Sequence, residues 1–126
     1  MFKKILLCLL ILTTFARTLD DLLADKITKK MNDNFTTTAL IEVTKNGSID
    51  MAKFIINAGA DINEKDFKGM TALMYASISG NENLVRLLLN KNADINIEDN
   101  NGMTAIMYAS KNNHIVIINL LFDKLI

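Results

Sequence analysis

The hydrophobic and polar residues of this chain recur with a period of 33 positions. Segment 66–77 reads Asp-Phe-Lys-Gly-Met-Thr-Ala-Leu-Met-Tyr-Ala-Ser, and segment 99–110 reads Asp-Asn-Asn-Gly-Met-Thr-Ala-Ile-Met-Tyr-Ala-Ser. One period earlier, segment 38–40 aligns with segment 71–73, and no gap is needed in any of these alignments. A fixed period of this length predicts an architecture built from repeated structural units.

The spacing of the apolar residues predicts two short helices in each period. In the second period, these residues predict helices over 72–79 and 82–90. Thr71 is placed to cap the first helix, and Gly80 ends it. Asn92 follows the second helix at a position suited to a left-handed backbone, which Asn tolerates better than most residues. Neither helix can bury its apolar face alone, so we expect the units to stack into a solenoid.

The first 16 residues have the pattern of a secretory signal peptide. Lys3 and Lys4 precede an apolar stretch over 5–12, which is too short to span a bilayer, and small residues follow up to Ala16. We therefore expect export of the chain, with cleavage near Ala16/Arg17. A retained membrane anchor and an ordinary buried helix are the alternatives.

Residues 17–32 predict an amphipathic helix. Acidic residues near its start and basic residues near its end suit the helix dipole. Its apolar residues lie at helical spacing; they are Leu19, Leu22, Leu23, Ile27 and Met31. We expect this helix to cap the open edge of the first repeat. A helix lying on a membrane is the alternative, although the segment has no large aromatic anchors and no strongly cationic face.

The residues at the 33-residue period resemble the ankyrin repeat. The family pattern opens with Asp-x-x-Gly-x-Thr-Pro-Leu-His-x-Ala, continues through a Gly and a Leu-Leu pair, and closes with Gly-Ala-Asp-x-Asn. Segment 71–76, Gly80, the pair at 87–88 and segment 93–96 fill those positions. The resemblance covers 33–126 and implies an all-α ankyrin-repeat solenoid of helix-turn-helix units with β-turn tips. Its repeats are expected at 33–65, 66–98 and 99–126.

Two departures from the family pattern bear on stability. Ala72 and Ala105 stand where the family has Pro, which stiffens the start of the first helix. Met74 and Met107 stand where it has His, which forms hydrogen bonds between repeats. We expect these replacements to lower stability without changing the fold.

The resemblance also implies a concave binding surface made of turn tips and the exposed side of each first helix. Phe67, Met70, Ile78 and Met103 are expected there as apolar anchors, with lysines at the rim. The candidate partner-binding residues are Phe35, Lys45, Phe67, Lys68, Met70, Ile78, Asn100, Asn101, Met103, Lys111 and Asn112.

The C-terminal repeat ends in an apolar segment. Residues 115–122 read Ile-Val-Ile-Ile-Asn-Leu-Leu-Phe, whereas a terminal repeat normally presents a polar outer face. This segment could contact a partner or a second copy, it could belong to a shortened descendant of a longer array, or its face could simply be poorly protected.

Composition removes many function classes. The 126 residues suffice for one domain, and 14 basic residues balance 14 acidic ones, which argues against a general nucleic-acid binder. Removing residues 1–16 removes Lys3 and Lys4 but no acid, so 12 basic and 14 acidic residues remain and the net charge becomes −2. Cys8 is the only cysteine, which excludes a disulfide scaffold.

No catalytic, cofactor-binding or metal-binding site is expected. His114 is the only histidine, and it aligns with Asn81, which favours a structural or solvated role. Asp61 and Asp94 lie one period apart in Ala-Asp-Ile-Asn turns, where such side chains usually bond the local backbone.

The sequence therefore predicts a non-catalytic protein that binds an unidentified protein partner through its concave surface. A structural or assembly role, with docking or self-association through residues 115–122, is the alternative. No nucleic-acid partner is expected, and no stable membrane span after signal cleavage. The absence of Pro and the abundance of Asn, Ile and Lys suggest a bacterial protein that is periplasmic or secreted.

Overall fold

A computed structural model of the chain describes residues 35–125, with side chains described from Ala39 onward. Within this range six α-helices follow one another, and none of these residues forms a strand. The helices are α3 (Phe35–Lys45), α4 (Ile49–Asn57), α5 (Ala72–Ser79), α6 (Glu82–Asn90), α7 (Ala105–Lys111) and α8 (Ile115–Leu125). The expected signal peptide and capping helix lie outside the described residues. No helix in the described part is long and apolar enough to cross a membrane.

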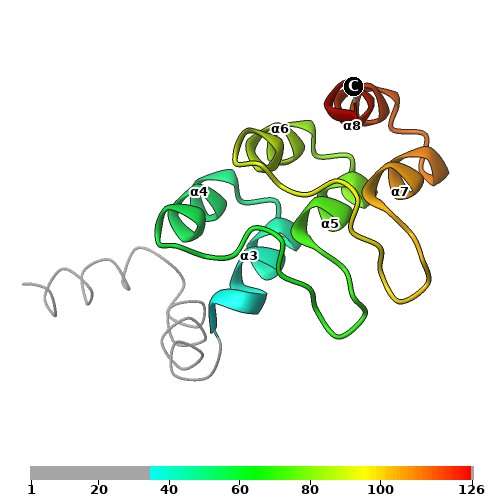
Figure 1. Ribbon diagram of the computed structural model, residues 1–126. Helices are drawn as coiled ribbons and strands as arrows, with labels where there is room; N and C mark the ends of the chain where they lie inside the picture. Colours follow the sequence, from blue (N-terminus) through cyan, green and yellow to red (C-terminus); the bar gives the residue numbers. More distant parts are fainter. Residues whose placement is uncertain (1–34, 126) are drawn as a thin grey trace, which may run out of the picture. The chain divides into compact units, whose positions relative to one another are not determined.

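The six helices form three antiparallel pairs that stack side by side (Figure 1). The inner layer contains α3, α5 and α7, and the outer layer contains α4, α6 and α8. Long loops project from the foot of the stack, between α4 and α5 and between α6 and α7. The start of α5 at Ala72 and that of α7 at Ala105 are 33 positions apart, so the helices follow the sequence period. The all-α solenoid expected from the sequence is confirmed.

The ends of the helices follow local chemistry. The helices over 72–79 and 82–90 form as predicted. Thr71 Oγ1 accepts a hydrogen bond from the Met74 amide at 3.4 Å, and Asn81 Oδ1 accepts one from the Leu84 amide at 3.1 Å, which caps α6. Asn92 adopts the expected left-handed backbone with φ 63°.

Buried leucine, isoleucine and alanine side chains hold the pairs together. Large side chains of the outer layer are fully enclosed, among them Leu84, Leu88, Ile117 and Leu121. Burial of one such side chain contributes about 1.5–3 kcal/mol. The alanines of the inner layer are equally enclosed, which lets neighbouring inner helices approach closely; they include Ala76 and Ala109.

The two methionines that stand where the family has His have different surroundings. Met74 is fully buried, so its thioether packs in the core between helices. Met107 is 46% exposed. The same sequence position therefore belongs to the core in the second repeat and to the surface in the third.

Candidate interaction surface

The turn before α5 is organised by the carboxylate of Asp66. Its Oδ1 accepts hydrogen bonds from the amides of Lys68 and Met70, each at 2.9 Å. Its Oδ2 accepts a 2.5 Å hydrogen bond from the hydroxyl of Tyr75, on the first turn of α5. The Asp66 amide in turn donates to the Met70 carbonyl at 3.0 Å. One side chain therefore ties the projecting turn to the helix that follows it.

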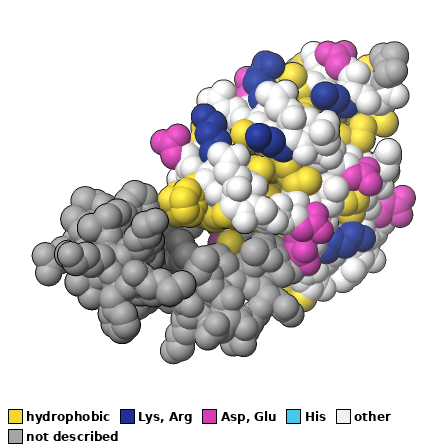
Figure 2. Space-filling view, turned by 60° about the vertical axis from the view of Figure 1, so that its left-hand side comes forward, with side chains coloured by type: hydrophobic (Ala, Val, Ile, Leu, Met, Phe, Trp, Pro, Cys, Tyr) yellow, Lys and Arg dark blue, Asp and Glu magenta, His cyan; other side chains and the backbone are white. Residues whose placement is uncertain are grey.

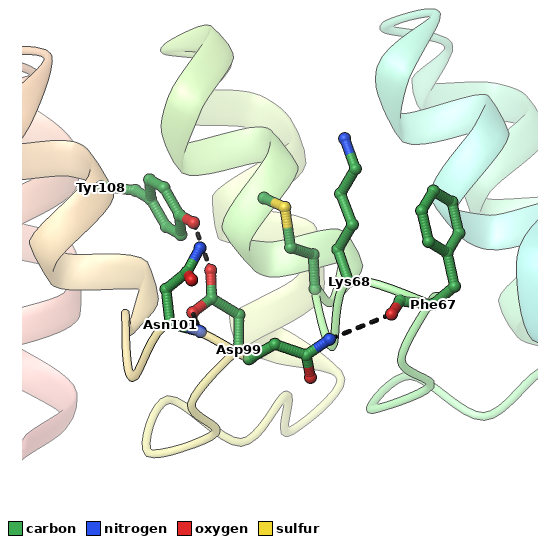
Figure 3. A pocket seen from close by; sticks show the side chains of 7 residues that line it. Phe67, Lys68, Asp99, Asn101 and Tyr108 are labelled. Atoms are coloured by element: carbon green, nitrogen blue, oxygen red, sulfur yellow. Dashed lines mark hydrogen bonds between the residues drawn. The ribbon is translucent and has the colours of Figure 1, made fainter.

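The third repeat has the same arrangement. Asp99 accepts hydrogen bonds from the amides of Asn101 at 2.8 Å and of Met103 at 2.9 Å, and from the hydroxyl of Tyr108 (Figure 3). Asp99 is buried, whereas Asp66 is half-buried. The two turn tips are thus copies of one hydrogen-bonded structure.

These bonds set the ionisation of both pairs. Desolvation opposes ionisation of Asp66, but hydrogen bonds from Tyr75 and from two backbone amides outweigh it, so the pKa of Asp66 is lowered. The hydrogen bond from Tyr108 is the main reason that the pKa of Asp99 is lowered. Burial and the bond to Asp66 raise the pKa of Tyr75 to about 12. The carboxylates therefore stay ionised near neutral pH, and their role in this geometry is structural.

The pKa of Tyr108 is raised in the same way as that of Tyr75. Its hydrogen bond to Asp99, together with burial, raises the pKa of Tyr108 to about 12. Both tyrosine hydroxyls are therefore protonated near neutral pH.

Neighbouring turn tips are joined directly. The Asn100 amide donates to the Lys68 carbonyl at 3.0 Å, and the Asn100 Nδ2 donates to the Phe67 carbonyl, also at 3.0 Å (Figure 3). Gly69 lies against the same asparagine: a Cβ at Gly69 would stand 2.7 Å from Asn100 Oδ1 and 2.9 Å from its backbone nitrogen. The two tips therefore form one continuous and rigid edge.

Two further contacts extend this edge toward the helices. The Asp94 amide donates to Asn63 Oδ1 at 2.7 Å, and Lys65 Nζ donates to the Glu98 carbonyl at 3.3 Å. Every one of these bonds joins residues 31–33 positions apart, so the repeat period itself brings the partners together.

An open hollow of about 550 Å³ lies between the two tips. Phe67 and Lys68 come from the tip of the second repeat, and Asn101 comes from the tip of the third. Asp99 and Tyr108 lie at the wall of the hollow (Figure 3). The complete lining is Phe67, Lys68, Met70, Asp99, Asn100, Asn101 and Tyr108. Hydrogen bonds within and between the two turns therefore fix the shape of this hollow.

Most of the predicted surface residues are exposed. Phe67 has 87% of its surface exposed, the largest fraction among the exposed large hydrophobic side chains described. Ile78 and Met103 are half-buried, and the side chain of Phe35 lies outside the described part. The exposed polar candidates are Lys45, Lys68, Asn100, Asn101, Lys111 and Asn112.

Met70 differs from the expectation of an exposed apolar anchor. Only 7% of its surface is exposed. The reason is that the Met70 amide is bonded to the Asp66 carboxylate, and the turn closed by this bond buries the Met70 side chain. Its side chain lines the hollow and is not a protruding contact. We therefore correct its role to that of a buried lining residue.

Asp99 and Tyr108 line the hollow but were not among the sequence-derived candidates. A signal for them exists, because the pairs Asp66–Tyr75 and Asp99–Tyr108 have the same nine-residue separation in consecutive repeats. Tyr75 has another contact: Lys45 Nζ lies 4.7 Å from the centroid of its ring, within cation–π range.

The remaining polar residues singled out by sequence have structural contacts. His114 Nε2 lies 3.0 Å from the Ile78 carbonyl, and a Cβ at Gly80 would stand 2.6 Å from the His114 ring. Asp61 accepts a 2.9 Å hydrogen bond from the Asn63 amide, and Asp94 accepts one of the same length from the Asn96 amide. Of the two roles expected for His114, structural or solvated, this contact favours the structural one. The turn roles predicted for Asp61 and Asp94 are confirmed.

A second surface of interest is the outer side of α8. Ile115 is 67% exposed, and the helix also exposes Val116, Phe122 and Leu125. On the face drawn in Figure 2, charges of both signs are mixed with hydrophobic side chains. The apolar side of α8 is thus an unpaired face at the end of the described stack.

Comparison with known proteins agrees with this geometry. The family model for ankyrin repeats (3 copies) matches residues 7–99 and 40–126. No curated protein matches the chain. Because the family matches extend over most of the chain and the helix pairs recur with its period, the chain belongs to the ankyrin-repeat family, whose repeats generally mediate protein–protein interaction and are typically non-catalytic.

Proposed function

We propose that this chain is an exported, non-catalytic scaffold that binds a protein partner through its turn tips and the exposed side of its first helices. The observation that carries the proposal is the hollow between the second and third tips, with the ring of Phe67 standing exposed at its edge. Exposed aromatic side chains beside a preformed hollow are typical anchors in protein interfaces.

The rigidity of the tips supports this function. Each tip is closed by the hydrogen bonds of one aspartate, and Asn100 joins the tips through two further bonds. A surface ordered before binding loses little conformational entropy when a partner docks, which favours affinity.

The absence of catalysis is proposed on the chemistry of the surface. Its two carboxylates are held ionised in turn hydrogen bonds, and its two tyrosines are held protonated. In the described part, no three His, Cys, Asp or Glu side chains gather as a metal site would require. Catalysis by acid–base exchange or by a bound metal therefore has no obvious starting point on this surface.

The binding function is tested by affinity capture with two matched variants. Phe67→Ala removes the exposed ring at the hollow, and Phe54→Ala removes a ring that is 62% exposed on α4 of the outer layer. We expect a partner that is recovered with the parent chain and with Phe54→Ala, but that is lost with Phe67→Ala. Equal recovery with both variants would refute binding at the tips.

Export is proposed from the N-terminal pattern of basic, apolar and small residues. The proposed destination of the exported chain is a bacterial periplasm or the cell exterior. The test is N-terminal sequencing of the chain recovered after expression in a bacterium. A mature start near Arg17 is expected, whereas an intact Met1 would contradict cleavage.

Assembly through α8 is a second candidate, favoured by the exposed Ile115, Val116 and Phe122. Light scattering on the parent chain and on Ile115→Lys separates this role from the first. An oligomer that dissociates on this substitution would support assembly. Ile117 is unsuitable for the experiment because it is fully buried, and a charge there would unfold the repeat.

A further inference from the structure

We infer that the hollow between the second and third turn tips selects an acidic peptide segment of its partner, one that places a large apolar side chain beside a carboxylate. This inference rests on the proposed function and specifies the chemistry of the partner. It follows from three properties of the hollow: which charges are already paired, which apolar atoms are open, and which amide remains exposed.

The acidic groups of the two tips are already occupied. Asp66 and Asp99 each accept two backbone hydrogen bonds and one tyrosine hydrogen bond, so their charges face donors inside the turns. Asp99 is the carboxylate that borders the hollow, and it is buried. A basic side chain of a partner would find no open acceptor at this carboxylate.

The basic groups are placed differently. Lys68 lines the hollow and is exposed, and it forms no ion pair with the side chains described. Its Nζ lies 5.7 Å from the centroid of the Phe67 ring, so the cation and the aromatic ring occupy the same rim. Of the two charged residues in the lining, Asp99 is buried and Lys68 is exposed. The exposed charge at the hollow is therefore positive.

The apolar part of the lining comes from three residues. Phe67 presents its exposed ring at the rim, and the buried Met70 and the half-buried Tyr108 form part of the wall. A leucine or phenylalanine side chain of a partner would bury the exposed ring of Phe67 against this wall, while an adjacent aspartate or glutamate would reach Lys68.

The side-chain amides of the third tip, those of Asn100 and Asn101, differ in availability. Asn100 Nδ2 already donates to the Phe67 carbonyl, so this group is used within the chain. Asn101 is exposed, and it lies beside Tyr108 in Figure 3. Its side-chain amide can donate to and accept from a peptide backbone, which would orient an extended segment across the tips.

The experiment is a selection from a random library of 12-residue peptides displayed on phage, with the full chain immobilised. We expect enrichment of peptides in which Asp or Glu adjoins Leu, Ile or Phe. A synthetic peptide from the enriched set should bind about tenfold more weakly to Lys68→Glu, and the binding should weaken as salt is raised. Lys53→Glu on α4 is the matched control, since Lys53 is exposed and does not line the hollow.

A second selection on Lys68→Glu tests the charge directly. We expect its enriched peptides to carry Lys or Arg in place of Asp or Glu. Peptides without acidic residues from the parent chain, or no enriched peptide at all, would overturn the inference. In those cases the proposed function still stands if Phe67→Ala loses the captured partner, and it fails separately if that variant keeps it.

Discussion

The hydroxyl of Tyr75 donates a 2.5 Å hydrogen bond to the carboxylate of Asp66, and Tyr108 forms the same bond with Asp99 one repeat later. Each bond runs from the first turn of an inner helix back to the turn tip that precedes it. The tips thereby become part of the folded stack, although they project from its foot (Figure 1). The geometry of the two turn tips depends on these two pairs.

Removal of the hydroxyl tests this dependence. Tyr75→Phe should lower the free energy of unfolding by about 1.5–3 kcal/mol, because it removes one hydrogen bond to a charged group but leaves the ring. Urea denaturation followed by circular dichroism measures the change. Tyr75→Phe combined with Asp66→Asn should cost less than the sum of the two separate changes, because both remove the same bond. Strict additivity of the two would contradict direct coupling.

The two tyrosines should titrate abnormally. Because the pKa of each is raised from 10 to about 12 in the folded chain, this contribution to stability is complete below pH 10 and is lost as the pH rises toward 12. The chain contains 2 tyrosines, so tyrosinate absorbance reports these two groups alone. We expect a folded midpoint above that of the urea-unfolded chain. Coincident midpoints would rule out the two hydroxyl–carboxylate bonds in solution.

The two aspartates should make the stability of the chain fall at low pH, whereas the tyrosines make it fall at high pH. The pKa values of Asp66 and Asp99 are lowered in the folded chain, so their contribution is present above about pH 4 and is lost as the pH falls through the folded values. The urea midpoint should therefore decrease on acidification from about pH 5 to about pH 2. In Tyr75→Phe this decrease should be smaller. If the urea midpoint of Tyr75→Phe decreased with pH as steeply as that of the parent chain, Tyr75 would contribute nothing to the lowered pKa of Asp66.

Much of the fold was predictable because its signals are local. Thr71, Gly80 and Asn92 act on the backbone within a few residues of themselves, so their spacing was enough to predict the helices around them. The stacking followed from the repeat, since identical units must bury equivalent faces.

The hollow was harder to predict because its contacts cross between elements. The pairing of Asp66 with Tyr75 spans nine positions, and it depends on how the turn folds back against α5. The burial of Met70 follows from that same turn, so a pattern of exposed tip positions could not show it. Asn100 bonds to a neighbouring repeat, where only the stacking distance decides whether its side chain reaches Phe67.

Alanine substitutions at two glycines, Gly69 and Gly102, separate the effect of the contact between the tips from the effect of backbone strain. Gly69 has φ 76° and Gly102 has φ 75°, so alanine meets nearly the same backbone strain at both positions, about 1–2 kcal/mol. At Gly69, however, a Cβ would also collide with Asn100, whereas at Gly102 nothing lies within 4 Å. Gly69→Ala should therefore destabilise the chain more than Gly102→Ala in urea denaturation. Equal losses of unfolding free energy in the two variants would show that Gly69 is not in close contact with Asn100 of the neighbouring tip.

The terminal helix α8 offers a contrast between two isoleucines two positions apart. Ile117 is fully buried, so Ile117→Ala should cost about 2–5 kcal/mol, whereas Ile115 is 67% exposed and Ile115→Ala should change stability by less than about 0.5 kcal/mol. Since repeats contact only their neighbours, the loss at Ile117 should first release the third repeat. Hydrogen exchange should then show faster exchange over α7 and α8 while the amides of α5 stay protected. Uniform acceleration over all the helices would instead mean that the solenoid unfolds as a single cooperative unit.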